Sequence, residues 1–126
     1  LYHILKVDSA NYNITLAQSR ASLFLKLSKI YSKETCYPKC RNSWIVSNPT
    51  LGHCAIVSLI LNDYFGGKIY KIKVDGISHY FNYINNSIVD LTAKQFNKKI
   101  DYSNKIKKGR EEMLNDIDTL NRYHIL

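Results

Sequence analysis

Apolar residues recur at helical spacing in two segments of the chain. In residues 16–32 they form one stripe, which consists of Leu16, Leu23, Phe24, Leu27, Ile30 and Tyr31. Thr15 and Gln18 precede it with the spacing of a capping box, so we predict an amphipathic helix of about four turns. Residues 55–61 are apolar nearly all round, which is typical of a buried central helix. Gly66 and Gly67 are predicted to end that helix, because glycine adopts a left-handed conformation without strain.

Between residues 68 and 91 the pattern changes to that of β-strands. Residues 68–74 alternate, and the Asp75-Gly76 pair that follows is a strong signal for a tight hairpin turn. Residues 77–84 form the second predicted strand. Asn85 and Asn86 then separate it from a third strand at residues 87–91. The short connections predict that these strands pair in antiparallel fashion.

The remaining segments are less regular. Residues 33–53 contain both prolines and are predicted to form an ordered loop. Thr92 and Gln95 repeat the capping-box spacing and predict a short helix. Residues 98–109 are interpreted as a basic connector, and the apolar positions from about Arg110 onward predict a final helix.

Helices and strands are segregated along the chain, so the predicted fold class is α+β, with a small antiparallel sheet and helices at both ends. The 126 residues are expected to form one domain, 1–126, in which residues 1–14 are an N-terminal extension. The composition of 45% hydrophobic and 22% charged residues is ordinary for a globular protein. No apolar run reaches the roughly 18 residues that cross a bilayer, so no membrane partner is expected. The first residues lack the features of a secretory signal, and the question of an upstream segment is open because the chain begins with Leu1.

The cysteine count and the charge indicate an environment rather than a function. Three cysteines are an odd number for a secreted disulfide framework, so a reducing, cytoplasmic location is expected. Two arrangements stay open: a Cys36–Cys40 disulfide with Cys54 free, or three thiols. The net charge of +8 is compatible with a polyanionic partner. The excess is mostly Lys in a chain rich in Asn, Ile and Tyr, which indicates compositional bias as much as a binding surface.

Cys54, His79 and Asp90 form the candidate catalytic set. A nucleophilic cysteine needs its thiolate, whereas a free thiol titrates near about 8.5. Cys54 follows a loop and precedes the apolar helix, so the unpaired N–H groups of a first helical turn would stabilise its thiolate and the oxyanion of a tetrahedral intermediate. His79 lies in the second predicted strand and Asp90 in the third.

The turn between these strands decides whether His79 and Asp90 meet. If Asn85 and Asn86 form a two-residue turn, then Phe81 opposes Asp90 in the antiparallel pair. His79 and Asp90 are then diagonal neighbours on one face, because residues two apart on a strand share a face. A four-residue loop would instead place them directly opposite, and an odd loop without a bulge would separate them. A carboxylate that accepts from the imidazole would fix its tautomer and orientation, as the third member of a triad does.

Each of the three residues also has a structural interpretation, and two further functions compete. Cys54 is explained equally by core packing, His79 by packing among aromatic residues, and Asp90 by the start of the short helix. The first rival function is a zinc site, for which the available ligands are Cys36, Cys40, His53 and Cys54, although their spacing is loose. Another alternative is a papain-like fold that no longer catalyses a reaction.

The second rival function is nucleic-acid binding by the basic segment near the C-terminus. Its cationic residues are Lys94, Lys98, Lys99, Lys105, Lys107, Lys108 and Arg110. Phe96 and Tyr102 lie among them and would stack on bases while the lysines neutralise phosphates. A solvated connector explains the same residues and is favoured over nucleic-acid binding.

Several separated motifs occur at residues 35–38, 44, 48–55, 63–67, 78–80, 82, 90–92, 95–96 and 122–123. Together these motifs resemble the YunG-like family of small bacterial proteins. The resemblance covers residues 20–126 and implies a papain-like or transglutaminase-like core with Cys54 as nucleophile, His79 as base and Asp90 as acid. The family favours Gln where this chain has His53, and a histidine at that position can also donate a hydrogen bond.

The sequence and the resemblance together predict a cysteine hydrolase or acyltransferase that acts on an amide or other acyl bond without a cofactor or metal. Asn48 and His53 are the candidate oxyanion or substrate-binding residues, since papain-like enzymes place an amide about six residues before the nucleophile. The alternative for Asn48 is a simple turn before Pro49. Peptide, isopeptide, glutamine, peptidoglycan and arylamine ester substrates all fit the same triad, and the oligomeric state is not indicated.

Overall fold

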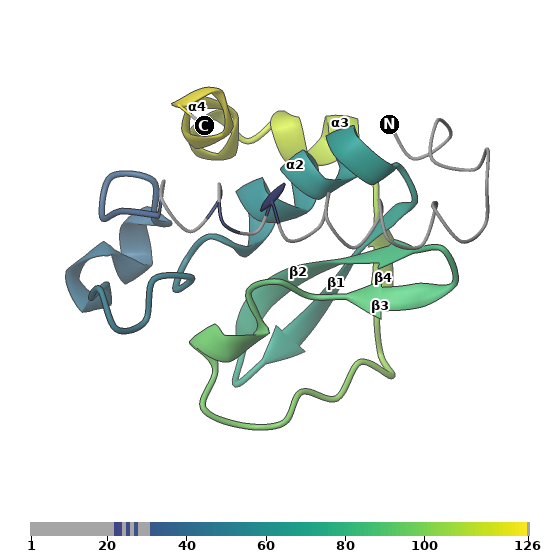
Figure 1. Ribbon diagram of the computed structural model, residues 1–126, viewed down its shortest axis with the longest axis horizontal. Helices are drawn as coiled ribbons and strands as arrows, with labels where there is room; N and C mark the ends of the chain where they lie inside the picture. The colour runs from purple at the N-terminus through teal and green to yellow at the C-terminus, as the bar shows by residue number, and fades with distance from the viewer. Residues whose placement is uncertain (1–21, 24, 26, 28–30, 126) are drawn as a thin grey trace.

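The computed structural model describes residues 22, 23, 25, 27 and 31–125 (Figure 1). The regular elements are the 3₁₀ helix Pro38–Ser43 (η2), α2 (Cys54–Phe65), β1 (Lys68–Val74), β2 (Ile77–Ile84), β3 (Ser87–Val89), the 3₁₀ helix Ala93–Gln95 (η3), β4 (Ile106–Lys108), α3 (Arg110–Leu114) and α4 (Ile117–Ile125). Of the predicted helix at residues 16–32, the described positions 22, 23, 25 and 27 are helical, whereas residues 31 and 32 are not, so the predicted end of the helix was wrong. The rest of that helix before residue 31, and the predicted extension at residues 1–14, lie outside the described residues.

The apolar segment of the sequence forms α2 as predicted. Its buried residues occur around most of its circumference, and they are Ile56, Val57, Ser58, Leu59, Leu61 and Phe65. Gly66 follows the helix with a φ of 69°, and its N–H donates to the Asn62 carbonyl oxygen at 2.9 Å. Val57, Leu61 and Phe65 pack with Leu23 and Leu27 in one hydrophobic cluster, so α2 is the centre of the core.

The four strands form one antiparallel sheet in the order β3-β2-β1-β4. Val74 pairs with Ile77, and Ile84 pairs with Ser87, so both hairpins have two-residue turns. For the second hairpin, this is the first of the two turn lengths considered from the sequence. The turn residues have the positive φ angles of tight hairpin turns: 52° at Asp75, 79° at Gly76, 53° at Asn85 and 61° at Asn86. The α+β class with an antiparallel sheet is therefore confirmed.

Different segments cover the two faces of the sheet (Figure 1). On one face lies α2, and Asn82 of β2 donates to the Ser58 carbonyl oxygen of this helix at 2.9 Å. On the other face, Ile72 and Phe81 pack against Phe96 and Tyr102 from the segment that follows β3. The sheet is thus sandwiched between α2 and a loop that carries few regular elements.

Three predicted boundaries differ from the structure. The predicted connector at residues 98–109 contains β4, which pairs with β1 at the edge of the sheet. This edge strand is short and charged, so its own sequence carries no apolar alternation. The third strand ends at Val89 rather than at residue 91. The segment after it forms only the 3₁₀ turn η3, in which the Thr92 hydroxyl donates to Asp90 at 3.4 Å and does not cap the turn.

The predicted final helix is divided into α3 and α4. Asp116 interrupts it, because its Oδ1 accepts a hydrogen bond from the Thr119 N–H at 2.9 Å and so caps the start of α4. No helix among the described residues has the length and apolar character needed to span a membrane.

Gly67 and Gly76 offer a matched test of backbone packing at the strand ends. Their φ angles are +76° and +79°. A Cβ at Gly67 would lie 2.4 Å from the Tyr83 carbonyl oxygen, whereas no atom of the described residues lies within 4 Å of a Cβ at Gly76. We expect Gly76→Ala to lower the free energy of unfolding by about 1 kcal/mol, and Gly67→Ala to lower it by at least about 2 kcal/mol more. Urea unfolding measures both values, and equal losses would contradict the close approach of β2 to Gly67.

Candidate functional site

Cys54 is the first residue of α2 and lines a cleft of about 590 Å³. Its Sγ lies 4.0 Å from the Ser78 carbonyl oxygen of β2. The residue before it, His53, makes no side-chain hydrogen bond to the first helical turn. The N–H groups of that turn are therefore left without a side-chain cap beside the thiol, as predicted for this position.

Gly52 connects the segment before α2 to three other parts of the fold. Its N–H donates to Gln95 Oε1 at 3.2 Å, and its carbonyl oxygen accepts from the Tyr37 N–H at 2.9 Å and from Arg122 Nη1 at 3.2 Å. Its φ is +76°, and a Cβ there would lie 2.4 Å from Cys36 Sγ. This position therefore requires glycine, and these contacts fix where α2 begins.

His79 and Asp90 meet across the second hairpin, as the register predicts. The fully buried His79 has its Nε2 2.7 Å from Asp90 Oδ2. The same carboxylate accepts from Tyr102 Oη at 2.8 Å and from the Thr92 N–H at 3.2 Å. Phe96 contacts the imidazole edge-on, with ring centroids 4.9 Å apart. The imidazole is therefore held in one orientation by hydrogen bonding and packing.

The protonation of His79 reflects both neighbours of its ring. Burial by itself lowers the pKa of His79, but its interactions with the Asp90 carboxylate and the neighbouring Cys54 outweigh burial and raise the pKa to about 9. The second ring nitrogen, Nδ1, is buried and has no hydrogen-bond partner among the described residues. Since Asp90 occupies Nε2, we infer that Nδ1 is the nitrogen on the Cys54 side.

The early end of β3 explains how Cys54 comes close to His79. Cys54 lies on the side of the sheet that α2 covers, whereas the His79 side chain lies on the other face. The ladder between β2 and β3 covers only Asn82, Tyr83 and Ile84 of β2. Toward Ser78, no other described strand pairs with this side of β2. Cys54 approaches β2 in this region, where it contacts the Ser78 carbonyl group. An unpaired stretch of strand edge thus lies where the Cys54 thiol reaches β2, one residue before His79.

The two predicted oxyanion residues lie outside the cleft lining. Asn48 donates to the Gln95 carbonyl oxygen at 3.5 Å and takes part in a turn with Ile45. His53 is fully buried, with Nε2 2.7 Å from Thr35 Oγ1 and Nδ1 2.9 Å from the Leu51 carbonyl oxygen. Burial lowers the pKa of His53 to about 4, so this ring is neutral near pH 7. Both side chains hold the loop before α2.

Gln95 and Tyr102 are site residues that the sequence patterns assigned to other roles. Gln95 lines the cleft, and its amide is fixed because Oε1 accepts from Gly52 while Nε2 donates to the Thr92 carbonyl oxygen at 3.0 Å. From the sequence, the capping-box spacing predicted only a local contact between Thr92 and Gln95. Tyr102 appeared in a basic segment, and nothing in its spacing from Asp90 indicates their contact.

The zinc alternative finds no support in the arrangement of its ligands. No group of three or more His, Cys, Asp or Glu residues within the described part of the chain could hold a metal ion. The fully buried Cys36 donates its thiol to the Leu51 carbonyl oxygen at 3.1 Å, and both nitrogens of His53 are engaged. All three cysteines are free thiols, so of the two predicted cysteine arrangements the structure has the one without a disulfide.

The basic segment has intramolecular partners for several of its groups. Lys98 pairs with Asp75 at 2.7 Å and Lys108 with Glu112 at 2.9 Å, while Lys105 lies over the Tyr70 ring. Phe96 and Tyr102, which the nucleic-acid alternative needs as exposed stacking surfaces, instead pack on His79 and Phe81. Both rings are therefore partly buried against the hydrophobic cluster beneath the sheet.

Fold and site together describe an α+β protein in which a helix-terminal thiol lines a cleft beside a buried His–Asp pair. The model of the family described as "YunG protein" matches residues 19–126, so this chain belongs to that family. "Uncharacterized protein YunG" of Bacillus subtilis (strain 168) is 34% identical over 84 residues, which cover 67% of this chain and 72% of that protein. No solved structure shows significant similarity to the chain.

The raised pKa of His79 can be tested by NMR titration of the histidine rings. We expect His79 to titrate near about 9 and Asp90→Asn to lower this value, while the buried His53 keeps its pKa of about 4 in both proteins. A folded-state pKa above the unfolded value of about 6.5 stabilises the protein fully below that pH, and this contribution is lost as pH rises toward 9. The free energy of unfolding should therefore fall over this interval in the wild type and much less in Asp90→Asn.

Asp75→Asn is the matched control for that substitution. Asp75 also makes an ion pair of 2.7 Å, with Lys98, but both side chains are at least half exposed. We expect the control to leave the titration of His79 unchanged. An ordinary pKa for His79 in the wild type would contradict the hydrogen-bonded pair.

Proposed function

We propose that this protein is a cysteine-dependent hydrolase or acyltransferase with a papain-like core, acting on an amide or related acyl bond. The observation that supports this most strongly is the orientation of His79, whose Nε2 is held by Asp90 at 2.7 Å while Nδ1 has no hydrogen-bond partner among the described residues. Cys54 contributes to the raised pKa of this ring. A thiol, an oriented imidazole and a supporting carboxylate are the parts that nucleophilic acyl transfer requires.

In the proposed reaction, Cys54 Sγ attacks the substrate carbonyl carbon while the thiol proton resides on His79. The tetrahedral intermediate collapses when the bond to the leaving amine or alcohol breaks, and His79 supplies the proton that this group takes up. Water, or an acceptor amine in a transferase, then loses a proton to His79 and attacks the thioester. The acyl group departs and the Cys54 thiolate is restored.

The charge of His79 supports this role for Cys54. With a pKa of about 9, the imidazole is protonated at neutral pH. A neighbouring imidazolium stabilises a thiolate, as does the start of a helix, and Cys54 has both. Asp90 stabilises the imidazolium in turn and fixes its orientation.

We assign the oxyanion donors to the N-terminus of α2 and to Gln95. Cys54 and Ala55 of the first helical turn line the cleft, as does Gln95. The Gln95 Nε2 group has two protons and donates one of them to the Thr92 carbonyl oxygen. The other proton is available for a substrate oxygen. The hydrogen bond from the Gly52 N–H to Gln95 Oε1 holds the amide group in place. Gln95 thus takes the role first sought at Asn48 or His53.

Site-resolved alkylation with iodoacetamide tests the activation of Cys54. At about pH 6.5 we expect Cys54 to react at least about tenfold faster than Cys40, which lines the same cleft, and His79→Ala to remove most of this difference. The buried Cys36 should stay unmodified, which reports that the protein is folded. The exposed His124 provides the control His124→Ala, which should change nothing.

Acyl transfer itself can be tested with p-nitrophenyl acetate as a generic acyl donor. Mass spectrometry should detect acetyl-Cys54 in the wild type, and much less of it in His79→Ala at equal fold integrity. Gln95→Ala should slow acetylation by about tenfold or more while leaving the alkylation rate of Cys54 nearly unchanged, because only acylation develops an oxyanion. A Cys54 that alkylates and acylates like an ordinary thiol would favour the non-catalytic alternative.

A further inference from the structure

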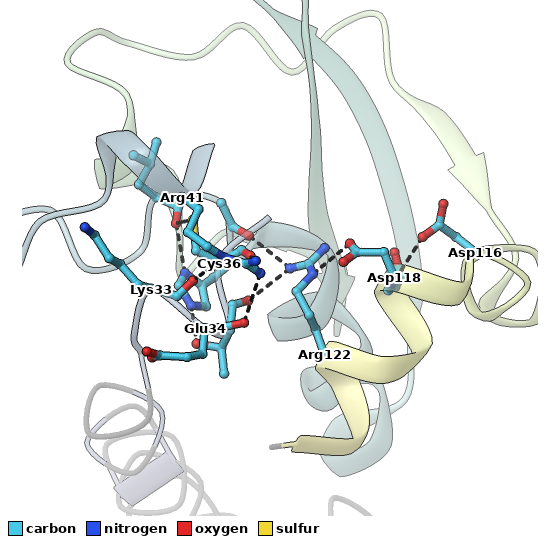
Figure 2. Close-up of polar contacts among 12 residues, drawn as sticks. Lys33, Glu34, Cys36, Arg41, Asp116, Asp118 and Arg122 are labelled. Atoms are coloured by element: carbon cyan, nitrogen blue, oxygen red, sulfur yellow. Dashed lines mark hydrogen bonds and ion pairs between the residues drawn. The ribbon is translucent and has the colours of Figure 1, made fainter. Parts of the chain in front are cut away.

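Arg122 of α4 is a buried cation on the wall of the cleft that contains Cys54. It is only 4% exposed, yet it lines this cleft. Figure 2 shows its side chain extending from α4 toward the loop that carries Glu34 and Cys36. Burying a guanidinium is costly unless its donors are satisfied, so the partner of each nitrogen is informative.

Two of the three guanidinium nitrogens have structural partners. Nε donates to Asp118 Oδ2 at 2.9 Å, and Nη1 donates to the carbonyl oxygens of Thr35 at 3.1 Å and Gly52 at 3.2 Å. These bonds explain how α4 is attached to the loop before α2. They leave Nη2 without a hydrogen-bond partner among the described residues.

The surroundings of Nη2 favour an anionic ligand. The charged residues of the cleft lining are Lys39, Lys73, Lys108, Arg122, Glu112 and Asp116, which gives a net charge of +2. Glu112 is already paired with Lys108, and Asp116 accepts the Thr119 N–H. The Tyr37 ring lies 5.6 Å from the guanidinium carbon and restricts its orientation. Each acidic group of the cleft has a partner other than Arg122. The Nη2 donor of Arg122 has none among the described residues.

We propose that Arg122 Nη2 binds a carboxylate of the substrate on which Cys54 acts, an inference that rests on the proposed function. The substrate is then an acyl compound with a carboxylate near the bond to be broken, such as a peptide with an acidic group or a free C-terminus. A single negative charge fits better than a phosphate, because only one nitrogen of Arg122 is free and Asp118 already offsets part of its charge.

Two alkylating agents that differ only in charge test this assignment. N-iodoacetylglycine carries a carboxylate, and N-iodoacetylglycinamide is its neutral analogue. The ratio of their rates at Cys54, divided by the same ratio for free N-acetylcysteine, should be about fivefold or more in the wild type. It should fall to near one in Arg122→Gln, and Lys39→Gln should lower it less than about twofold, since long-range attraction by an exposed lysine is screened.

A second measurement on the wild type avoids dependence on the folding of Arg122→Gln. We expect N-acetylglycine to protect Cys54 from iodoacetamide, and N-acetylglycinamide at the same concentration to have no effect. Equal protection by both compounds, or by neither, would overturn the carboxylate site. So would a rate ratio that responds to Lys39→Gln as strongly as to Arg122→Gln.

The outcome is separable from that of the proposed function. Protection by N-acetylglycine is measurable even if Cys54 alkylates slowly and independently of His79, in which case the carboxylate site stands and the catalytic role falls. If Cys54 is activated by His79 but shows no preference for the charged reagent, the catalytic role stands and Arg122 is only a structural residue.

Discussion

The Asp90 carboxylate is the interaction on which the arrangement of the site depends. It accepts hydrogen bonds from His79, Tyr102 and Thr92, which belong to a strand, the long loop below the sheet and the turn after β3. Because one carboxylate connects these segments, the orientation of the His79 imidazole depends on how the loop that carries Tyr102 packs against the sheet. Removing the charge would therefore affect packing as well as the protonation of His79.

A second junction lies at Gly52, two residues before the thiol. The backbone N–H and C=O groups of Gly52 make hydrogen bonds to Gln95, Tyr37 and Arg122. Its positive φ and its close approach to Cys36 leave no room for a side chain. The start of α2 is thereby fixed by residues from both later and earlier parts of the chain. In the proposed enzyme, this junction holds the nucleophile, the oxyanion donor and the substrate-binding arginine relative to one another.

The register of the second hairpin was predictable because its turn chemistry is local. Asn85 and Asn86 tolerate positive φ, a two-residue turn fixes which residues oppose each other, and the shared face of His79 and Asp90 follows by counting. The edge strand Ile106–Lys108 was missed because its pairing depends on an exposed edge of β1 rather than on its own pattern. The division between α3 and α4 was missed because an aspartate cap interrupted an otherwise continuous apolar stripe.

The sequence by itself determined the local features: a buried helix that begins at Cys54, two tight hairpins, an antiparallel sheet and the pairing of His79 with Asp90. Each of these depends on residues close along the chain. Only the tertiary structure decided that His53 is buried and neutral, and that Gln95 and Arg122 line the cleft. It also decided that one donor of Arg122 finds no hydrogen-bond partner in the described part of the chain. These properties come from contacts between residues 43 to 87 positions apart in some cases, such as Gly52 with Gln95 and Thr35 with Arg122. No periodic sequence pattern indicates such long-range contacts, because they result from how the layers of the fold pack together.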